Sequence, residues 1–207
     1  MKIQRFSRLH NLLCITLLGS FLISCSPSPS NPSSGSKPVF VSNTNTAKAT
    51  SQYRLQEKAP EFSLKDLTGK TVSLSSFEGK FVVIHFATTW CPFCNAEAQH
   101  LEKLYQDYQS KGVEVLIIDV KEPASLIQKK LKNRFNLSFP ILLDDDGAVA
   151  ASYAPEEVLP ELARDEVALA SNILIDPQGN IQFFSLLDTQ NFDAELIALK
   201  TRLNELL

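Results

Sequence analysis

The stretch FVVIHFATTWCPFC, residues 81–94, decides the fold. Its apolar run, interrupted only by His85, predicts a central strand that is buried on both faces. Pro92 has a φ angle pre-set for the first helical turn and has no N–H to leave unpaired, so it predicts a helix that begins there. Cys91 and Cys94 therefore lie at a strand-to-helix junction, with Cys91 at or just before the helix N-terminus.

The helix N-terminus favours the thiolate form of Cys91, because free backbone N–H groups and the helix dipole stabilise negative charge there. An ordinary thiol with a pKa near ~8.5 is only roughly three per cent thiolate at pH 7. Lowering that pKa by about two units would make the thiol roughly three-quarters ionised, for about 2.7 kcal/mol of differential stabilisation. Cys91 is thus a candidate nucleophile for disulfide exchange.

Other chemistries of a Cys-x-x-Cys pair fit this sequence less well. A structural zinc site usually takes its four ligands from two pairs, and no second pair is present. Covalent haem attachment needs a histidine directly after the second cysteine, where this chain has Asn95. Inert packing of both cysteines stays an alternative, but the flanking Trp90 and Pro92 favour redox chemistry. No metal or organic cofactor is expected.

The first 24 residues predict an export signal. A basic start containing Lys2, Arg5 and Arg8 precedes an apolar segment at 12–23, which is too short for a membrane-spanning helix of about twenty residues. The segment ends in Leu-Ile-Ser-Cys at 22–25, which resembles the lipobox of bacterial lipoproteins. That resemblance implies cleavage before Cys25 and its lipidation, which anchors the exported protein to a membrane. An ordinary signal peptide is the alternative.

The rest of the chain divides into a tether and one domain. Residues 25–54 are rich in Ser, Pro, Asn and Thr, and such a segment buries too little surface to offset its ordering entropy. Residues 55–207 suffice for one domain with a hydrophobic core. Of the four cysteines, Cys14 would be removed with the signal, which leaves Cys91 and Cys94 in the domain. A formal net charge of −3 gives no sign of nucleic-acid binding.

The pattern of the domain predicts a mixed β-sheet flanked by helices, an α/β fold. A hairpin is expected first, followed by the Cys-containing strand and helix, a strand and helix, a short strand, a second hairpin and a last helix. The expected ranges are 61–64 and 71–74 for the first hairpin, 81–86, 92–110, 113–120, 125–135 and 141–143 for the central elements, and 171–176, 181–186 and 192–207 for the rest.

Three motifs resemble the thioredoxin-fold thiol–disulfide oxidoreductases of the TlpA/ResA type, in the redoxin (AhpC/TSA-like) superfamily. They are Phe86 to Cys94, the leading Ala-Pro-Glu-Phe at 59–62 and Leu-Ile-Asp-Pro-Gln-Gly at 174–179. The resemblance implies a thioredoxin-like fold and a membrane-tethered protein that exchanges disulfides with envelope proteins. Its partners would be protein thiols or disulfides and an electron donor or acceptor, and a monomer is expected.

Individual roles follow from position. Cys91 would attack, because it lies at the helix end and is expected to be the more exposed thiol, and Cys94 would resolve the mixed disulfide. His85 stands where thioredoxins carry a buried acid, so it is a candidate catalytic proton acceptor or else a buried structural imidazole. Trp90 is expected to offer an apolar platform or to join the core. Phe93 would tune the redox couple, contact substrates or simply pack.

Ala170 is a departure from the family. Alignment on Leu174-Ile175-Asp176 places it where thioredoxin-fold oxidoreductases have a cis-proline opposite the Cys pair. A cis bond before a non-proline residue costs about 2.5–4 kcal/mol, so a trans bond or a shifted loop is expected. The active-site environment is thus expected to comprise Thr88, Trp90, Pro92, Phe93 and Ala170.

Two alternative functions remain open. A peroxiredoxin-like peroxidase would use Thr88, three residues before Cys91, but the proline and arginine of that family are replaced by Ile84 and Ala170. A binding or scaffold lipoprotein is the other. An acidic helical insertion is expected at 155–168, and it is interpreted as a solvated helix face in preference to a partner surface. The aspartates at 144–146 favour a strand-ending turn over a calcium site. His100 is expected at the surface.

Overall fold

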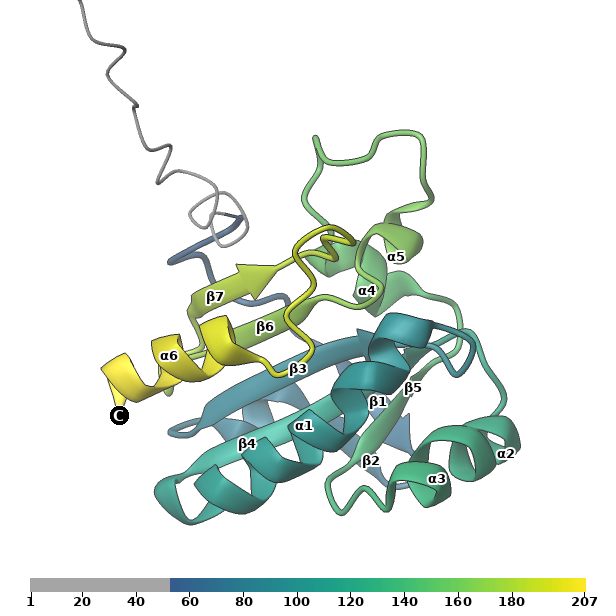
Figure 1. Ribbon diagram of the computed structural model, residues 1–207, viewed down its shortest axis with the longest axis horizontal. Helices are drawn as coiled ribbons and strands as arrows, with labels where there is room; N and C mark the ends of the chain where they lie inside the picture. Colours follow the sequence, from purple (N-terminus) through teal and green to yellow (C-terminus); the bar gives the residue numbers. More distant parts are fainter. Residues whose placement is uncertain (1–52) are drawn as a thin grey trace, which may run out of the picture. The chain divides into compact units, whose positions relative to one another are not determined.

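The computed structural model describes residues 53–207 (Figure 1). The predicted signal peptide, the predicted lipidation at Cys25 and nearly all of the predicted tether at 25–54 lie outside the described residues. Between Tyr53 and Leu207, none of the helices has the length and apolar character needed to cross a membrane.

The described chain contains seven strands, and helices connect most of them. The strands are β1 (Ser63–Asp66), β2 (Thr71–Ser73), β3 (Phe81–Ala87), β4 (Val113–Val120), β5 (Ile141–Asp144), β6 (Asn172–Ile175) and β7 (Ile181–Ser185). The helices are α1 (Pro92–Tyr108), α2 (Ala124–Ile127), α3 (Asn133–Phe135), α4 (Ala148–Tyr153), α5 (Arg164–Val167) and α6 (Ile197–Leu206). Short turns of other helical types are η1 (Leu74–Phe77), η2 (Gln109–Lys111) and η3 (Gln128–Lys132).

The strands form one mixed sheet in the order β2-β1-β5-β4-β3-β6-β7 (Figure 1). The three central strands β5, β4 and β3 are parallel, and both flanking hairpins add to them antiparallel. The most apolar strands, β3 and β4, pair along their length from Phe81↔Val113 to Ala87↔Asp119. Their central position explains why they are apolar on both faces.

Alternation along β3 divides the core into two layers, because successive side chains point to opposite faces of a sheet. Val83 and Ala87 pack in the layer with α1, α2 and α6, whereas Ile84 and Phe86 pack in the layer with α4. His85 has the same parity as Val83 and Ala87, so it lies on the face that α1 covers. The carboxyl end of β3 leads directly into Cys91 at the start of α1.

The expected order of strands and the Cys-containing helix match the structure, whereas several other helices differ from expectation. The last helix begins at Ile197 rather than at residue 192, because Leu196 has a left-handed φ of 58° and Asp193 Oδ2 accepts from Ala198 N–H at 2.8 Å. The helix expected at 125–135 is broken by the π turn η3. The helix α4 was not expected.

The predicted acidic helical insertion at 155–168 is wrong in most of its length. Only α5 is helical, and the residues before it form turns that include a left-handed Leu159 with a φ of 48°. The Arg164 guanidinium donates to the carbonyl oxygens of Val158, at 3.0 Å, and of Pro155, which holds the turns together. Side-chain hydrogen bonds from Arg164 thus hold this segment, in place of the helical hydrogen bonds that its composition suggested.

Candidate functional site

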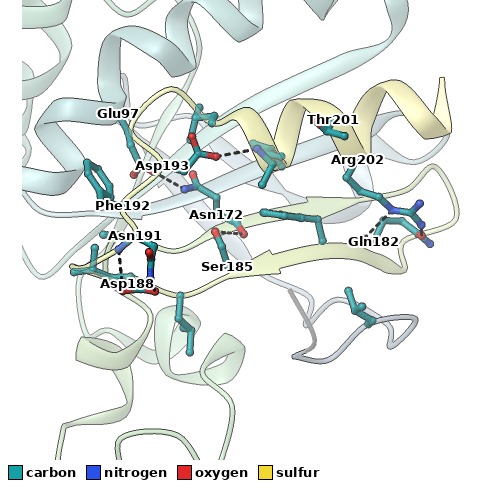
Figure 2. Close-up of a pocket in the computed structure, with 18 of the residues that line it drawn as sticks. Glu97, Asn172, Gln182, Ser185, Asp188, Asn191, Phe192, Asp193, Thr201 and Arg202 are labelled. Carbon is teal, nitrogen blue, oxygen red and sulfur yellow. Dashed lines mark hydrogen bonds between the residues drawn. The ribbon is translucent and has the colours of Figure 1, made fainter. Parts of the chain in front are cut away.

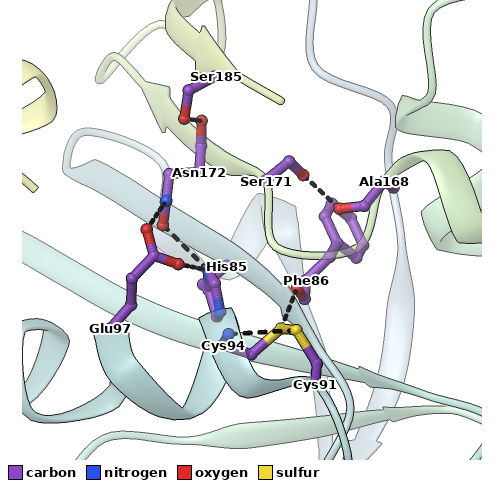
Figure 3. Close-up of polar contacts among 9 residues, drawn as sticks. All are labelled: His85, Phe86, Cys91, Cys94, Glu97, Ala168, Ser171, Asn172 and Ser185. Carbon is purple, nitrogen blue, oxygen red and sulfur yellow. Dashed lines mark hydrogen bonds and ion pairs between the residues drawn. A yellow bond between two sulfur atoms is a disulfide. The ribbon is translucent and has the colours of Figure 1, made fainter. Parts of the chain in front are cut away.

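Cys91 is the N-cap of α1, and Pro92 is the first residue of the helix. The Cys91 backbone is extended, with φ −72° and ψ 115°, and the Cys94 N–H donates to Cys91 Sγ at 3.1 Å. The two cysteines are joined by a disulfide bond with 5.4 Å between their Cα atoms (Figure 3). The helix terminus therefore directs a backbone donor and its dipole at the sulfur that was expected to attack.

The disulfide is covered, and Trp90 beside it is not. Cys91 is 5% exposed and Cys94 is 1% exposed, so the expected order of exposure holds, but both sulfurs are nearly enclosed. The Trp90 side chain is 68% exposed, which excludes a core position and leaves a large apolar surface next to the pair. Exposed tryptophan is typical of contact surfaces, since it presents apolar area at low entropic cost.

Phe93 connects the cysteine pair to the long loop between β7 and α6. It is half-buried and packs edge-on against Phe192, with 4.9 Å between ring centroids. The loop thus passes over the first turn of α1 instead of leaving it open. This contact ties the active-site turn to residues near the C-terminal helix.

Ala170 and Cys94 both contact the backbone carbonyl of Phe86. The Ala170 N–H donates to the Phe86 carbonyl oxygen at 2.8 Å, and Cys94 Sγ lies 3.9 Å from that same oxygen. The bond before Ala170 is trans, as are the other peptide bonds of the described residues. Ala170 has a left-handed φ of 58°. The loop therefore approaches the cysteine pair with a backbone geometry that a proline could not adopt.

A chain of three buried polar side chains lies on the other side of Cys94 (Figure 3). His85 Nδ1 is 3.0 Å from Asn172 Oδ1, and Asn172 Nδ2 donates to Glu97 Oε1 at 2.8 Å. The second oxygen of Glu97 is 3.5 Å from His85 Nδ1. Glu97 is on the first turns of α1, three residues after Cys94, so both side chains share one face of the helix.

Burial shifts the pKa values of the two titratable members in opposite directions. Removal from water raises the pKa of Glu97 to about 8, which the nearby Asp193 carboxylate also favours, while the Asn172 amide opposes it. Removal from water lowers the pKa of His85 to about 4, against the opposing effect of the hydrogen bonds that its ring makes to the Asn172 side chain and the Ser171 backbone. Desolvation penalises the charged form of each group, so both are neutral near pH 7.

A second buried acid lies at the carboxyl end of β4. Asp119 is 1% exposed, and neither of its carboxylate oxygens has a hydrogen-bond partner. Burial and the neighbouring Glu122 raise its pKa to about 8. Glu122 in turn accepts from the backbone N–H of Thr89 and from its hydroxyl at 2.8 Å. Thr88 is buried with an unpartnered hydroxyl, and its carbonyl accepts from Cys91 N–H at 3.2 Å.

The remaining expected sites have ordinary structural roles. Asp144 accepts from the backbone N–H groups of Val149 and Ala150, at 3.2 and 2.8 Å, so the aspartate run ends β5 and caps α4. His100 is half-buried on α1. Across residues 53–207, no cluster of three or more His, Cys, Asp or Glu side chains could hold a metal ion.

A groove of about 430 Å³ runs between the second hairpin and α6 and reaches the polar chain (Figure 2). Glu97, Asn172 and Ala170 line its inner end, and Arg202 and Gln182 line its outer end. Arg202 donates to the Gln182 side-chain oxygen at 3.1 Å and to Glu205 at 2.9 Å. The groove therefore leads from the surface to the buried Glu97 carboxyl.

Glu97 and Asn172 were missed by the sequence reasoning. A signal for Glu97 was present, since it falls on the buried stripe of α1 that contains Cys94, Leu101 and Leu104. A charged residue on an apolar helix stripe next to a reactive pair is a candidate site residue. Asn172 gave no comparable signal, because its partners come from β3 and α1, which are 87 and 75 residues away.

Comparisons with known proteins agree with this geometry. The model of the AhpC/TSA family matches residues 55–184. The thiol-disulfide oxidoreductase ResA of Halalkalibacterium halodurans is 37% identical over 128 residues, which are 62% of this chain and 66% of that protein. ResA of Geobacillus thermodenitrificans is 37% identical over 124 residues, 60% of this chain and 64% of that protein. The chain thus spans slightly less than two thirds of the length of these relatives.

The fold is also similar to solved structures. A solution structure from Bacteroides thetaiotaomicron, described as a putative protein disulfide isomerase, superposes with a TM-score of 0.63 at 27% identity. The match covers 76% of this chain and 92% of that chain. The predicted thioredoxin-like fold, a mixed sheet flanked by helices, is confirmed.

Proposed function

Because the chain belongs to the AhpC/TSA family, we propose that it is a thiol–disulfide oxidoreductase that exchanges disulfides with other proteins through Cys91 and Cys94. The observation that carries the proposal is the disulfide at the N-terminus of α1, with Cys91 as the helix cap. The names of the relatives support the same activity.

The exchange proceeds in two sulfur substitutions. In the reduced protein, the Cys91 thiolate attacks a client disulfide, forms a mixed disulfide and releases one client thiolate. The Cys94 thiolate then attacks Cys91 Sγ, so the Cys91–Cys94 bond forms and the second client sulfur leaves as a thiolate. The client gains two electrons and the protein loses two. The reverse sequence oxidises a client dithiol.

Glu97 is the better proton acceptor for Cys94, and we assign that role to it in place of His85. A general base works best when its pKa lies near the working pH, and Glu97, with a pKa of about 8, accepts a proton in its ionised form, a minority at pH 7 that grows as the pH approaches 8. His85, with a pKa of about 4, holds a proton on its basic nitrogen too weakly to serve near neutrality. Glu97 also shares the helix face of Cys94 and has one oxygen without a hydrogen-bond partner.

Clients would contact the exposed Trp90 beside the disulfide. Because both sulfurs are nearly covered, only client segments that reach them with little displacement of the surrounding surface would react. Ala170, in place of the usual proline, favours a narrow set of clients. The predicted lipid anchor at Cys25 would hold the domain at a bacterial membrane on the exported side. The protein would act as a monomer, and an upstream electron donor or acceptor would restore the Cys91–Cys94 pair after each exchange.

Trapping the mixed disulfide tests this function. A Cys94→Ser variant is expected to accumulate a mixed disulfide at Cys91 with a disulfide-bonded peptide, while Cys91→Ser forms none. His100→Ala is the matched control on α1 and should react like the unaltered protein. Equal trapping at residue 94 or no mixed disulfide at all would contradict the mechanism.

Two further measurements separate the alternatives. Rapid consumption of hydrogen peroxide by the reduced protein, far above the rate of free cysteine, would favour the peroxidase, for which the buried Thr88 hydroxyl is the supporting residue. Failure to form the Cys91–Cys94 bond in any redox buffer would favour a binding role. The equilibrium redox potential of the pair then distinguishes a reductase from an oxidase.

A further inference from the structure

The polar chain beside Cys94 is incomplete at both ends. His85 Nε2 at one end and Glu97 Oε2 at the other have no hydrogen-bond partner, although His85 is fully buried and Glu97 is 3% exposed. Asn172 joins the two residues through 3.0 and 2.8 Å contacts (Figure 3). Burying a polar atom without a partner is unfavourable, so such a chain calls for a role other than stabilisation.

The contacts give the hydrogen bonds of this chain a direction. When Glu97 is ionised it only accepts, and in that state the Asn172 amide nitrogen faces Glu97 Oε1, at 2.8 Å, while the amide oxygen faces His85. The amide oxygen accepts, so His85 Nδ1, the ring nitrogen that faces it, carries a proton. One amide thus sets the tautomer of the imidazole and the orientation of the carboxylate.

The Asn172 amide donates to Glu97 Oε1 at 2.8 Å. His85 Nδ1, whose proton faces Asn172 Oδ1, also lies 3.5 Å from Glu97 Oε2, so its N–H dipole is close to the carboxylate. Donors to the charged form favour ionisation, whereas burial and the Asp193 carboxylate from the β7–α6 loop oppose it. The other charged groups of the adjoining groove are Asp188, Arg202 and Glu205, and Arg202 is engaged by Gln182 and Glu205.

We propose that Asn172 and His85 are positioning residues that set the pH at which Glu97 loses its proton, with Asn172 as the main donor and His85 as the group that orients it. Neither residue touches the reacting sulfur through a hydrogen bond among the described contacts. The inference deepens the proposed function and rests on it for its catalytic meaning, since Glu97 is the acceptor assigned there.

The direct test is a carbon-13 NMR titration of the oxidised protein labelled at its glutamate carboxyl carbons, with Glu97→Gln used to assign the Glu97 signal. Asn172→Leu keeps the approximate shape of the side chain and removes both polar groups. It is expected to raise the titration midpoint of Glu97 by at least one pH unit. His85→Phe should raise it by a smaller amount, because the amide then loses the partner that orients it.

Asp119→Asn is the control, since it removes a buried acid from β4 and should leave the Glu97 midpoint within a few tenths of a pH unit. Thermal unfolding shows which variants fold. If Asn172→Leu does not fold, the Glu97 midpoint of His85→Phe decides the question. A folded variant with an unchanged or lowered Glu97 midpoint overturns the inference, because a merely structural role would lower stability without moving the titration.

The proposed function fails separately from this inference. The pH profile for resolution of the mixed disulfide is measured on the same variants. A profile that shifts together with the Glu97 midpoint supports both claims. A shifted midpoint with an unshifted profile supports the setting of Glu97 by Asn172 and His85, and it removes Glu97 from the exchange reaction.

Discussion

Ala170 shows how one residue reshapes the loop beside the disulfide. Its left-handed φ of 58° costs an alanine about 1–3 kcal/mol, which the surrounding structure must offset. The Ala170 N–H to Phe86 carbonyl bond and the burial of the side chain, 3% exposed, supply that support. A proline, with φ near about −65° and no N–H, fits neither requirement.

Restoring the family's proline should therefore destabilise this chain. Ala170→Pro is expected to lower the free energy of unfolding by about 2–4 kcal/mol, because it loses a buried hydrogen bond and forces the loop to move. Ala170→Gly, which accepts a positive φ, should leave that free energy unchanged within about 1 kcal/mol. Urea unfolding of the three proteins measures the differences, and a proline variant as stable as the glycine variant would refute the account of this loop.

At the scale of single elements, buried carboxylates are used in two distinct ways. Asp144 is 1% exposed and binds two backbone N–H groups at the start of α4, so it stabilises a helix that the sequence pattern did not predict. Asp119, equally buried, has no such partners. The first carboxylate stabilises a helix start, whereas the second is buried without backbone donors to it.

Loss of the Asp144 contacts should weaken α4. Asp144→Ala is expected to lower the free energy of unfolding by about 1–3 kcal/mol, because two helix-terminal donors lose their acceptor. The neighbouring Asp145 is exposed, so Asp145→Ala should change it by no more than about 0.5 kcal/mol. Calorimetric unfolding compares the two variants. Equal effects at both positions would show that the cap does not stabilise the helix.

The sequence predicted those elements whose signal is local. The apolar run of β3 and the Cys91-Pro92 helix start were readable because strand period and proline geometry act over a few residues. The start of α6 was misplaced, because the stretch before Ile197 is held by Asp193 and a left-handed Leu196. The Glu97–Asn172–His85 chain was found only in part, because its three members come from α1, β6 and β3 and meet only in the folded protein.

At the scale of the whole molecule, the buried titratable groups couple stability to pH. The pKa values of Glu97 and Asp119 are about 8 in the folded protein, against ordinary values of 4.5 and 3.8. Between those limits the folded protein holds more protons than the unfolded chain, so its stability falls as pH rises. His85, at about 4 against 6.5, contributes the opposite slope between those two pH values.

The two carboxyl groups act without that opposition above pH 6.5. The free energy of unfolding is therefore expected to decline from pH 6.5 to 8 in the oxidised protein, and a Glu97→Gln/Asp119→Asn double variant should show a flatter profile. Urea unfolding at half-unit pH intervals gives the slope. A stability that rises across this interval, or a double variant with the same slope, would contradict the pKa shifts.

The central claim is that the N-terminus of α1 keeps Cys91 as a thiolate that forms and breaks a bond with Cys94. The most direct measurement is the pH dependence of iodoacetamide alkylation of the reduced protein, with the modified cysteine identified by mass spectrometry. The account predicts that Cys91 reacts first, with an apparent pKa at least about one unit below the ordinary ~8.5, and that Cys94 stays protected. Alkylation of Cys91 at the pH of a free thiol, or preferential alkylation of Cys94, would contradict it.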